Sequence, residues 1–483
     1  MTTVWNPNTS TIVSPTQPQS TNVLQFGADP TGTFDSSAAF QAAINSFGTL
    51  GGKLILGPGS FLIGSQLSVN CPLIFEGKGA FGSGTQIVCT SATINVFDIV
   101  TSGVWFRDIL FTSNVTRTAG AYICFDNGSS VGYVQDCYML NWYWGVRIVP
   151  NAGPFYVRNL LCKNGSPGAG QAARVDGGTD ITFDYLVVDN PVGSLPDSGV
   201  CVTGCGDVSL INCQLQHCNF GLSVVPAANQ VAASVYAVNT FFDNSGVNGV
   251  RIKPLSATSC AIQRVRLVSC WASDSGSEGI LIDNSSTGGY GGIQAVQLTA
   301  LECYGNSNGV AINITGTSQG QVIIQGGFFA GNSNDGIQIF NGNDVTIDGA
   351  KCGPAGGFFG NTGYGIQALG VSNNLTITNC NLTNNTAGAF ADSGSGTFKT
   401  FANNNGLNNS ISRTNAVTPT GSPFTYTAGP TQETAYIFGG TVSSVVVDGA
   451  NVFATTNCTV SLGPGKVMQI TYSSTPSIVI THL

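Results

Sequence analysis

One phrase recurs along most of the chain at intervals of 22 to 30 residues, and it constrains the fold more than any other feature. It reads apolar-x-apolar, then Cys or an aromatic residue, Asn-Ser, and finally Gly-apolar-x-apolar, as in FFDNSGVNGVRI, which ends at Ile252. Short alternating strands separated by Gly, Asn and Ser turns at this period predict a β-solenoid. A helical repeat is excluded, because no copy carries a 3.6-residue apolar period.

Stacked coils bring the same repeat position into register, so like side chains are expected to form ladders. We predict an inward column, with Phe241 or Phe328 in intervening coils, that contains Cys137, Cys162, Cys213, Cys270, Cys303, Cys352 and Cys380. Cys is small and easily buried, so we interpret this column as packing rather than redox chemistry. A second column is predicted to join turns through amide hydrogen bonds, and it contains Asn244, Asn306, Asn332 and Asn361.

Residues 23–64 contain the one segment with a helical pattern. Asp35 can serve as its N-cap, and Gly48 stands where a C-cap glycine belongs. An apolar stripe between them is formed by Phe40, Ala43, Ile44 and Phe47. We therefore predict a helix near 35–47 that covers the open end of the solenoid.

The same segment resembles a known family. Its run FGADPTG, followed by DSSAAFQAAI and GGKLILGPGSFLI, is similar to the N-terminal segment of pectate-lyase-like right-handed parallel β-helix proteins, which are common among bacteriophage tailspikes. The resemblance implies an all-β, right-handed parallel β-helix that assembles as a homotrimer. Hydrolases, lyases and inactive relatives share the segment, so it implies the fold more strongly than the activity.

The chain is expected to divide into three parts. Residues 1–22, rich in Thr, Ser, Pro, Gln and Asn, predict an extended arm that attaches to the virion or to a partner. Residues 23–412 hold the solenoid and its capping helix. Residues 413–483 carry strand-like runs broken by Gly-Gly, Asp-Gly and Pro-Gly turns, which predict a C-terminal β-module. This tail resembles the small β-modules of phage and prophage tail proteins.

Composition excludes several functions. The 16 Lys and Arg against 24 Asp and Glu give a net charge of −8, and without a basic run we expect no nucleic-acid partner. No apolar stretch is long enough to span a membrane, and the N-terminus lacks a signal-peptide pattern, so we expect synthesis in the host cytoplasm. The resemblance to tailspikes implies a final place in a virion tail. Cys and His do not occur at metal-ligand spacing, so we expect neither metal nor cofactor.

Charged residues concentrate between residues 243 and 302, which hold nine of the chain's 40. Glycoside hydrolysis needs a carboxylic acid and a carboxylate separated by roughly 5–5.5 Å or 6.5–9.5 Å, a spacing that adjacent or alternate coils supply. The catalytic candidates are Asp243, Asp274, Glu278, Asp283 and Glu302. The structural alternative is that Lys253 and Asp283 form only a surface ion pair and that the turn aspartates only shape turns.

Strand alternation predicts an outward polar strip that suits the hydroxyls and ring faces of a sugar chain. The substrate-binding candidates are Arg251, Lys253, Trp271, Asn313, Gln338, Trp142 and Trp144. Trp142 and Trp144 fit a subunit interface equally well, because aromatic side chains fill such interfaces.

Three functions follow from these features. The first is a homotrimeric tailspike, attached to other tail or baseplate proteins through its N-terminal arm, that binds a host surface polysaccharide and depolymerises it with an Asp/Glu pair. The second is a receptor-binding or structural spike without turnover. The third is a bacterial polysaccharide lyase, for which Arg251, Lys253, Arg264 or Arg266 would be the base.

Overall fold

The computed structural model describes residues 19–149, 153–256, 260–285, 292–315, 320–407, 414–429 and 432–482. The predicted arm, residues 1–22, lies almost entirely outside the described residues. The chain forms two compact units, residues 1–319 and residues 320–483, which we describe one after the other.

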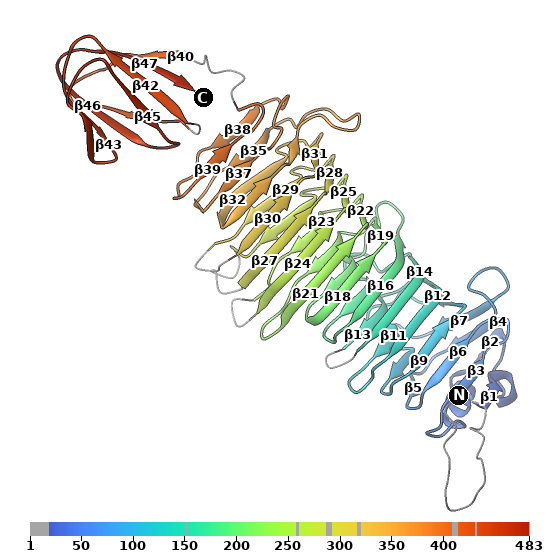
Figure 1. Ribbon diagram of the computed structural model, residues 1–483. Coiled ribbons are helices and arrows are strands. Elements are labelled where there is room, and N and C mark those ends of the chain that lie inside the picture. Colours follow the sequence, from blue (N-terminus) through green and yellow to red (C-terminus); the bar gives the residue numbers. More distant parts are fainter. Residues whose placement is uncertain are drawn as a thin grey trace, which may run out of the picture. The chain divides into compact units, whose positions relative to one another are not determined.

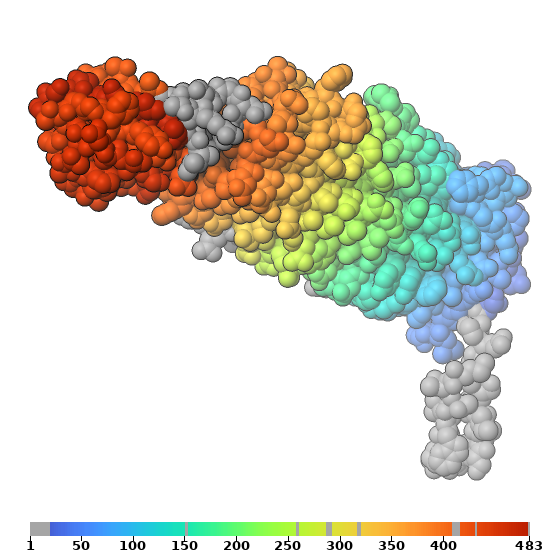
Figure 2. All heavy atoms as spheres, turned by 45° about the horizontal axis from the view of Figure 1, so that its top comes forward, coloured from blue at the N-terminus to red at the C-terminus, as the bar shows by residue number. Residues whose placement is uncertain are grey.

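The first unit is a parallel β-solenoid (Figure 1). One coil is represented by β12 (Gly132–Leu140), which bends at Asp136, followed by β13 (Trp144–Ile148). Each strand pairs in parallel with its equivalent in the next coil, for instance Val146 with Ala173. In Figure 2 the colour of this unit changes steadily from blue through green to yellow, as expected when coils stack in sequence order.

Two parallel sheets make up the coils of the first unit. The narrow sheet contains β5 (Leu67–Val69), β8 (Phe97–Ile99), β11 (Ala121–Phe125), β13, β15 (Gln171–Val175), β17 (Ser198–Val202), β20 (Phe220–Val224), β23 (Asn248–Ile252), β26 (Ile280–Asp283) and β29 (Val310–Asn313). The wide sheet contains β1 (Gln19–Asn22), β2 (Thr31–Asp35), β3 (Gly52–Ile55), β4 (Gly59–Ile63), β6 (Leu73–Glu76), β7 (Thr85–Cys89), β9 (Val104–Arg107), β10 (Ile109–Ser113), β12, β14 (Phe155–Lys163), β16 (Ile181–Asp189), β18 (Cys205–Ile211), β19 (Gln214–Gln216), β21 (Val231–Val238), β22 (Phe241–Asp243), β24 (Ala261–Val268), β25 (Trp271–Ser273), β27 (Gly292–Thr299) and β28 (Glu302–Tyr304).

A bend divides the wide sheet into a first half and a second half. The bend residue adopts a left-handed conformation in successive coils, as at Asn159, Asn212 and Asn239, with φ of 50°, 53° and 48°. Asn and Asp tolerate this conformation because their short polar side chains bond locally. The outer surface of a coil therefore has three faces: the first half, the second half and the narrow sheet.

The interior holds the inward side chains of all three faces, and every cysteine of the chain is buried and outside any disulfide. The prediction of a single cysteine column is wrong, because Cys137 is in register with Leu160 whereas Cys162 is in register with Met139. They occupy two neighbouring inward columns. The outward residue between these columns is the first one in the second half of the wide sheet. Phe241 is also misplaced, since Phe242 is the fully buried residue of that pair and Phe241 faces outward.

The N-terminal segment forms η1 (Val23–Phe26) and α1 (Ser37–Asn45). The predicted stripe is confirmed, because Phe40, Ala43 and Ile44 are fully buried. Ser36 rather than Asp35 is the N-cap residue, and Asp35 instead accepts hydrogen bonds from the Ser37 backbone and hydroxyl. That α1 covers the end of the solenoid stays a prediction.

The second unit begins with further parallel strands: β30 (Gln321–Gln325), β31 (Phe328–Ala330), β32 (Ile337–Asn343), β33 (Val345–Asp348), β34 (Lys351–Cys352), β35 (Tyr364–Ala368), β36 (Ser372–Asn373), β37 (Thr376–Thr378), β38 (Gly388–Asp392) and β39 (Thr400–Ala402). The asparagine ladder exists here, since Asn332 donates to Asn361 and Asn361 to Asn385, both at 2.8 Å. Asn244 does not belong to such an inward ladder, because it is an exposed turn residue with φ 51°.

The last segment forms two four-stranded antiparallel sheets, as the turn pattern predicts. One has the order β40 (Thr414–Val417), β47 (Ser477–His482), β42 (Glu433–Phe438) and β45 (Cys458–Leu462). The other has the order β41 (Phe424–Thr427), β46 (Val467–Ser474), β43 (Thr441–Val447) and β44 (Ala450–Phe453). A shared apolar cluster includes Ile437, Val445, Leu462, Ile470 and Ile480.

Candidate functional site

The nine charged residues of segment 243–302 do not share one face. The chain turns at Asn244 and again at Asp274, where φ is 51° and 48°, so consecutive strands of one coil face different directions. Asp243 and Glu302 lie on the second half of the wide sheet, and Arg264 and Arg266 lie on the first half. Arg251 and Asp283 lie on the narrow sheet, and Lys253 follows directly after β23. The charged residues are therefore divided among three surfaces. The outward strip that alternation predicted does exist on the narrow sheet, where Arg251 is in register with Leu281 and Asp283 with Asn313.

One of these surfaces brings predicted acids and an aromatic platform together. It comprises Phe241, Asp243, Trp271, Asp274, Glu302 and Tyr304, which we call the aromatic–acidic cluster. Phe241, Trp271 and Glu302 are in register on three adjacent strands. The Trp271 ring lies 5.7 Å from the Phe241 ring and 5.7 Å from the Tyr304 ring, which it meets edge to face. Phe242, Ala272 and Cys303 alternate with these residues and point into the core, which fixes the outward direction of the cluster.

The two aspartates of the cluster have different surroundings. Both carboxylate oxygens of Asp243 accept hydrogen bonds, one from the Ser273 hydroxyl and one from the Asn244 amide at 2.8 Å. Partial burial and then the charge of Asp243 raise the pKa of Asp274. Asp243 pairs with Ser273, the residue before Asp274, so the two aspartates lie about one strand spacing and one residue apart, roughly 6 Å between Cα atoms.

Glu302 and Tyr304 complete this surface. The Tyr304 hydroxyl donates to Glu302 Oε2 at 3.1 Å. Burial and the neighbouring Glu302 raise the pKa of Tyr304, so its hydroxyl stays protonated and keeps the glutamate oriented. Trp271 is half-buried, and its indole Nε1 has no hydrogen-bond partner among the described residues.

Most of the other predicted acids and amides are already engaged with neighbours. Lys253 Nζ lies 2.7 Å from Asp283 Oδ2, and although burial opposes ionisation, this contact and hydrogen bonds from Ser285 lower the pKa of Asp283. Glu278 accepts hydrogen bonds from Asn248 and Ser277. These contacts fit the structural alternative for Asp283.

Asn313 and Gln338 were predicted to bind substrate from the outward strip. Asn313 is in register with Asp283 on the narrow sheet and is partly exposed. In the second unit, Gln338 is 5% exposed and donates to Asp335 and Gln367, which leaves little of its amide accessible.

The two tryptophans near residue 143 differ. The prediction that Trp142 presents its ring to a ligand is wrong, because the side chain is fully buried and fills the space above Gly165, where a Cβ would lie 2.2 Å from the indole. Trp144 is partly exposed on the narrow sheet. The guanidinium groups of Arg147 and Arg174 lie 4.7 Å and 5.1 Å from the centre of its ring, as cation–π contacts.

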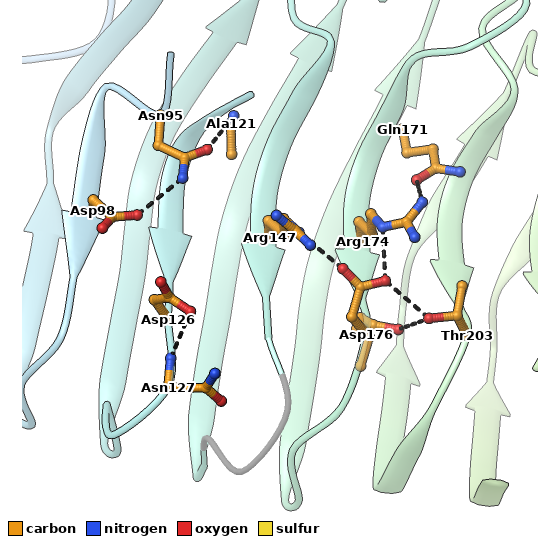
Figure 3. Close-up of polar contacts among 11 residues, drawn as sticks. Asn95, Asp98, Ala121, Asp126, Asn127, Arg147, Gln171, Arg174, Asp176 and Thr203 are labelled. Atoms are coloured by element: carbon orange, nitrogen blue, oxygen red, sulfur yellow. Dashed lines mark hydrogen bonds and ion pairs between the residues drawn. The ribbon is translucent and has the colours of Figure 1, made fainter. Parts of the chain in front are cut away.

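Sequence reasoning missed an ionic network on the narrow sheet. Figure 3 shows Arg147, Arg174 and Thr203 directed toward Asp176 from adjacent strands. Asp176 accepts from Arg147 Nε at 2.8 Å, Arg174 Nε at 2.7 Å and Thr203 Oγ1 at 2.9 Å. Although burial opposes ionisation, these contacts lower the pKa of Asp176. The available signal was the outward position of Arg147 and Arg174 in two consecutive copies of the repeat.

The same face carries a carboxyl group with the opposite shift. Burial and then the charge of Asp126 raise the pKa of Asp98, although Asn95 donates to its Oδ1 at 2.9 Å. Asn95 is itself oriented by the Ala121 backbone, as Figure 3 shows.

Among the described residues, no group of three His, Cys, Asp or Glu side chains could hold a metal ion. In the same part of the chain, no helix has the length and hydrophobicity needed to cross a membrane.

Comparison with known proteins gives matches in structure only. Neither the models of known protein families nor the curated protein sequences match this sequence. A mutant tailspike protein of E. coli bacteriophage HK620, in complex with a pentasaccharide, is similar with a TM-score of 0.53 at 11% identity, over 95% of this chain and 93% of that chain. Tailspike protein 3 of bacteriophage CBA120 has a TM-score of 0.52 at 14% identity, over 81% and 62% of the two chains. The A-module of the Azotobacter vinelandii mannuronan C-5 epimerase AlgE4 has a TM-score of 0.51 at 14% identity, over 79% and 96%.

These matches show that the chain has the parallel β-solenoid fold of phage tailspikes and of polysaccharide-modifying enzymes, as the resemblance of the N-terminal segment implied. At such low identity they show the fold and not the activity.

Proposed function

We propose that this chain is a tailspike-type protein that binds a host cell-surface polysaccharide and hydrolyses it at the aromatic–acidic cluster. The observation that carries this proposal is the pairing of Asp274, whose pKa is raised, with Asp243, whose two oxygens accept hydrogen bonds. Two carboxyl groups whose surroundings differ in this way can divide the roles of acid and base.

In this mechanism Asp274 donates its proton to the glycosidic oxygen as the bond breaks. Asp243, held by Ser273 and Asn244, acts as the carboxylate that attacks the sugar or activates a water. A Cα separation of roughly 6 Å is compatible with retention or inversion, depending on the side-chain rotamers. The rings of Trp271 and Phe241 would stack against sugar faces beside the carboxyl pair.

Glu302 is the other carboxylate beside Trp271, and we assign it a positioning role. It is paired with Trp271 across two adjacent strands, and its carboxylate accepts a hydrogen bond from the Tyr304 hydroxyl. A carboxylate fixed in this way can accept hydrogen bonds from sugar hydroxyls and so set the register of the chain over the two aspartates.

The test is to incubate the purified protein with capsule and lipopolysaccharide fractions of its host and to follow product size together with ultraviolet absorbance. Asp243→Asn and Asp274→Asn should each abolish shortening. Asp207→Asn is the matched control, because Asp207 is an exposed carboxylate on the first half of the wide sheet and should not matter.

Shortening without a new absorbance band identifies a hydrolase. Shortening with the absorbance of an unsaturated sugar would replace hydrolysis by elimination, and tight binding without shortening would leave an adhesion spike and refute the roles of Asp243 and Asp274.

We also propose that three copies associate and that the N-terminal arm attaches them to a virion. A ring ladder on the first half supports association: Trp105 and Tyr156 are 39% and 41% exposed, and Tyr133 packs between them at 4.4 Å and 5.0 Å. Exposed aromatic side chains of this kind are typical of subunit interfaces. Sedimentation equilibrium at several concentrations should give three times the chain mass of 49.7 kDa, and a monomer would contradict this part of the proposal.

A further inference from the structure

A short loop of the second unit holds two phenylalanines outside the solenoid. It comprises residues 353–360, with the sequence GPAGGFFG, and we call it the phenylalanine loop. Phe359 is 86% exposed, which is the largest exposed fraction of any large apolar side chain among the described residues, and Phe358 is 42% exposed. Neither ring takes part in the proposed cleavage site.

The chain fixes the shape of this loop. Phe358 N donates to the Ala355 carbonyl oxygen at 2.8 Å, and the two residues between them, Gly356 and Gly357, have φ of 58° and 93°. These values match the two central positions of a type I′ turn, which glycine adopts without strain. No atom lies within 4 Å of a Cβ added at either glycine, so the turn extends into solvent.

The base of the loop is held against its neighbours. Gly331 N donates to the Phe359 carbonyl oxygen at 2.9 Å. On the other side, a Cβ at Gly360 would lie 1.8 Å from the Asn384 carbonyl oxygen, so the backbone of the loop lies directly against the following coil. While these contacts persist, Phe359 cannot be buried by folding back onto the solenoid.

The nearest charge beside the loop is positive. The loop itself has no charged residue. Lys351 precedes it, and the Lys351 Nζ lies 6.0 Å from the centre of the Phe328 ring, which is 40% exposed. The acid closest in sequence, Asp348, accepts hydrogen bonds from Thr378 and Asn379 at 2.8 Å. The exposed rings therefore have a cation beside them and are suited to an anionic surface.

The size of the exposed patch favours a lipid surface over a protein partner. The rings of Phe358 and Phe359 expose roughly 250 Å² together, if a whole phenylalanine side chain has about 200 Å². A stable protein interface buries about 800 Å² on each partner. Binding to a bilayer requires less, because a few apolar side chains at the headgroup boundary act together with basic residues that attract anionic lipids.

We propose that the phenylalanine loop inserts Phe358 and Phe359 into the headgroup region of an anionic lipid bilayer, with Lys351 beside the lipid phosphates. The inference goes beyond the proposed function, because it concerns a lipid surface and not a polysaccharide. The contact is peripheral and reversible, since only two rings leave water.

The test is flotation of the full chain with large unilamellar vesicles, made either of phosphatidylethanolamine and phosphatidylglycerol in equal parts or of phosphatidylcholine alone. The wild type should bind the anionic vesicles more tightly. Phe359→Ser should weaken this binding by about tenfold, because one ring no longer leaves water. Phe81→Ser is the matched control, since Phe81 is 67% exposed in a turn of the first unit and its variant should bind as the wild type does.

Two further variants separate the charge from the rings. Lys351→Gln should weaken binding to the anionic vesicles by about fivefold and leave binding to phosphatidylcholine unchanged. Phe359→Trp reports insertion directly, because its fluorescence should shift to shorter wavelength when anionic vesicles are added, whereas that of Phe81→Trp should not. Phe359 is exposed, so its variants should melt as the wild type does.

The proposal is overturned if the wild type does not float with anionic vesicles, or if Phe359→Ser binds them as tightly as Phe81→Ser does. The other candidate occupant is a second copy of the chain. If Phe359→Ser lowers the mass found by sedimentation equilibrium, the ring is buried between copies, and the proposal is likewise overturned.

Discussion

The glycines that mark the repeat are explained by close backbone approach, and Gly249→Ala tests this explanation. A Cβ added at Gly249 would lie 2.7 Å from the carbonyl oxygen of Gly279 in the next coil, and 3.2 Å and 3.3 Å from the Cβ atoms of Ala272 and Phe242. The same clash recurs with the next coil's glycine carbonyl at Gly199, Gly221 and Gly279. Because the nearest atom is backbone, a substitution must move two coils apart or distort the strand.

Overpacking of this kind costs roughly 1–3 kcal/mol. For a unit of about 300 residues, the entropy of unfolding is about 0.6 kcal/mol per kelvin, so the melting temperature should fall by about 2–5 °C. We would measure melting by circular dichroism and the urea midpoint by tryptophan fluorescence, at one scan rate and one protein concentration.

Gly292→Ala is the matched control. No atom lies within 4 Å of a Cβ at Gly292, which also occupies a strand of the first unit. This variant should be within about 0.5 kcal/mol of the wild type, or slightly more stable because the unfolded chain loses freedom. Superimposable unfolding curves for Gly249→Ala and Gly292→Ala would refute the view that close approach selects these glycines.

Three further predictions follow from the electrostatics and the domain organisation. Asp243→Asn should lower the pKa of Asp274 toward the ordinary aspartate range without reaching it, because burial remains the larger cause of the raised pKa. The titration of the Asp274 carboxyl group can be followed by ¹³C NMR, and an unchanged titration would contradict the coupling between the two aspartates. Hydrogen bonds from Arg107 and Lys53 lower the pKa of Glu76 from 4.5 to about 2, so its stabilising effect should be present above pH 4.5 and be lost as the pH falls to about 2. Between pH 4.5 and about 2, the melting temperature of Glu76→Gln should therefore fall less than that of the wild type. Parallel curves of melting temperature against pH would contradict the lowered pKa of Glu76. Residues 413–483 expressed alone should give the circular dichroism of a folded β-protein and a cooperative melt, since they have their own apolar cluster, whereas a random-coil spectrum would show that they are not a module.

The repeat predicted the fold because stacking acts on every coil alike. An inward position must be apolar and a close approach must be glycine, so the pattern of FFDNSGVNGVRI gave β22, β23 and the turn between them. The columns of the interior were harder to predict. Each coil has two inward positions beside the bend, and a cysteine fits both, so sequence spacing could not distinguish Cys137 from Cys162.

Outward side chains obey no such constraint, so their grouping was predicted only in part. Proximity in sequence placed Asp243, Trp271 and Asp274 together correctly, because they lie at neighbouring positions of two adjacent coils. The prediction that Arg251 and Asp283 belong to the same patch was wrong, because a single left-handed residue at each turn directs the next strand to another face. The prediction that Trp142 binds substrate was wrong for a related reason. This turn residue points inward, and its ring fills the space that Gly165 leaves empty.

This difference between inside and outside bears on how such a solenoid can carry function. Inward columns repeat because each coil must pack on the next, so a sugar-binding or catalytic group can be added only at outward positions, where a change in one coil leaves the stacking intact. The outward arginines show this freedom. Arg147 and Arg174 are consecutive members of one column and share Asp176, whereas the next arginine of that column, Arg251, forms no ion pair within the described part of the chain. An arginine is not required by stacking at this position, since Cys201 and Ser223 occupy the same column between Arg174 and Arg251.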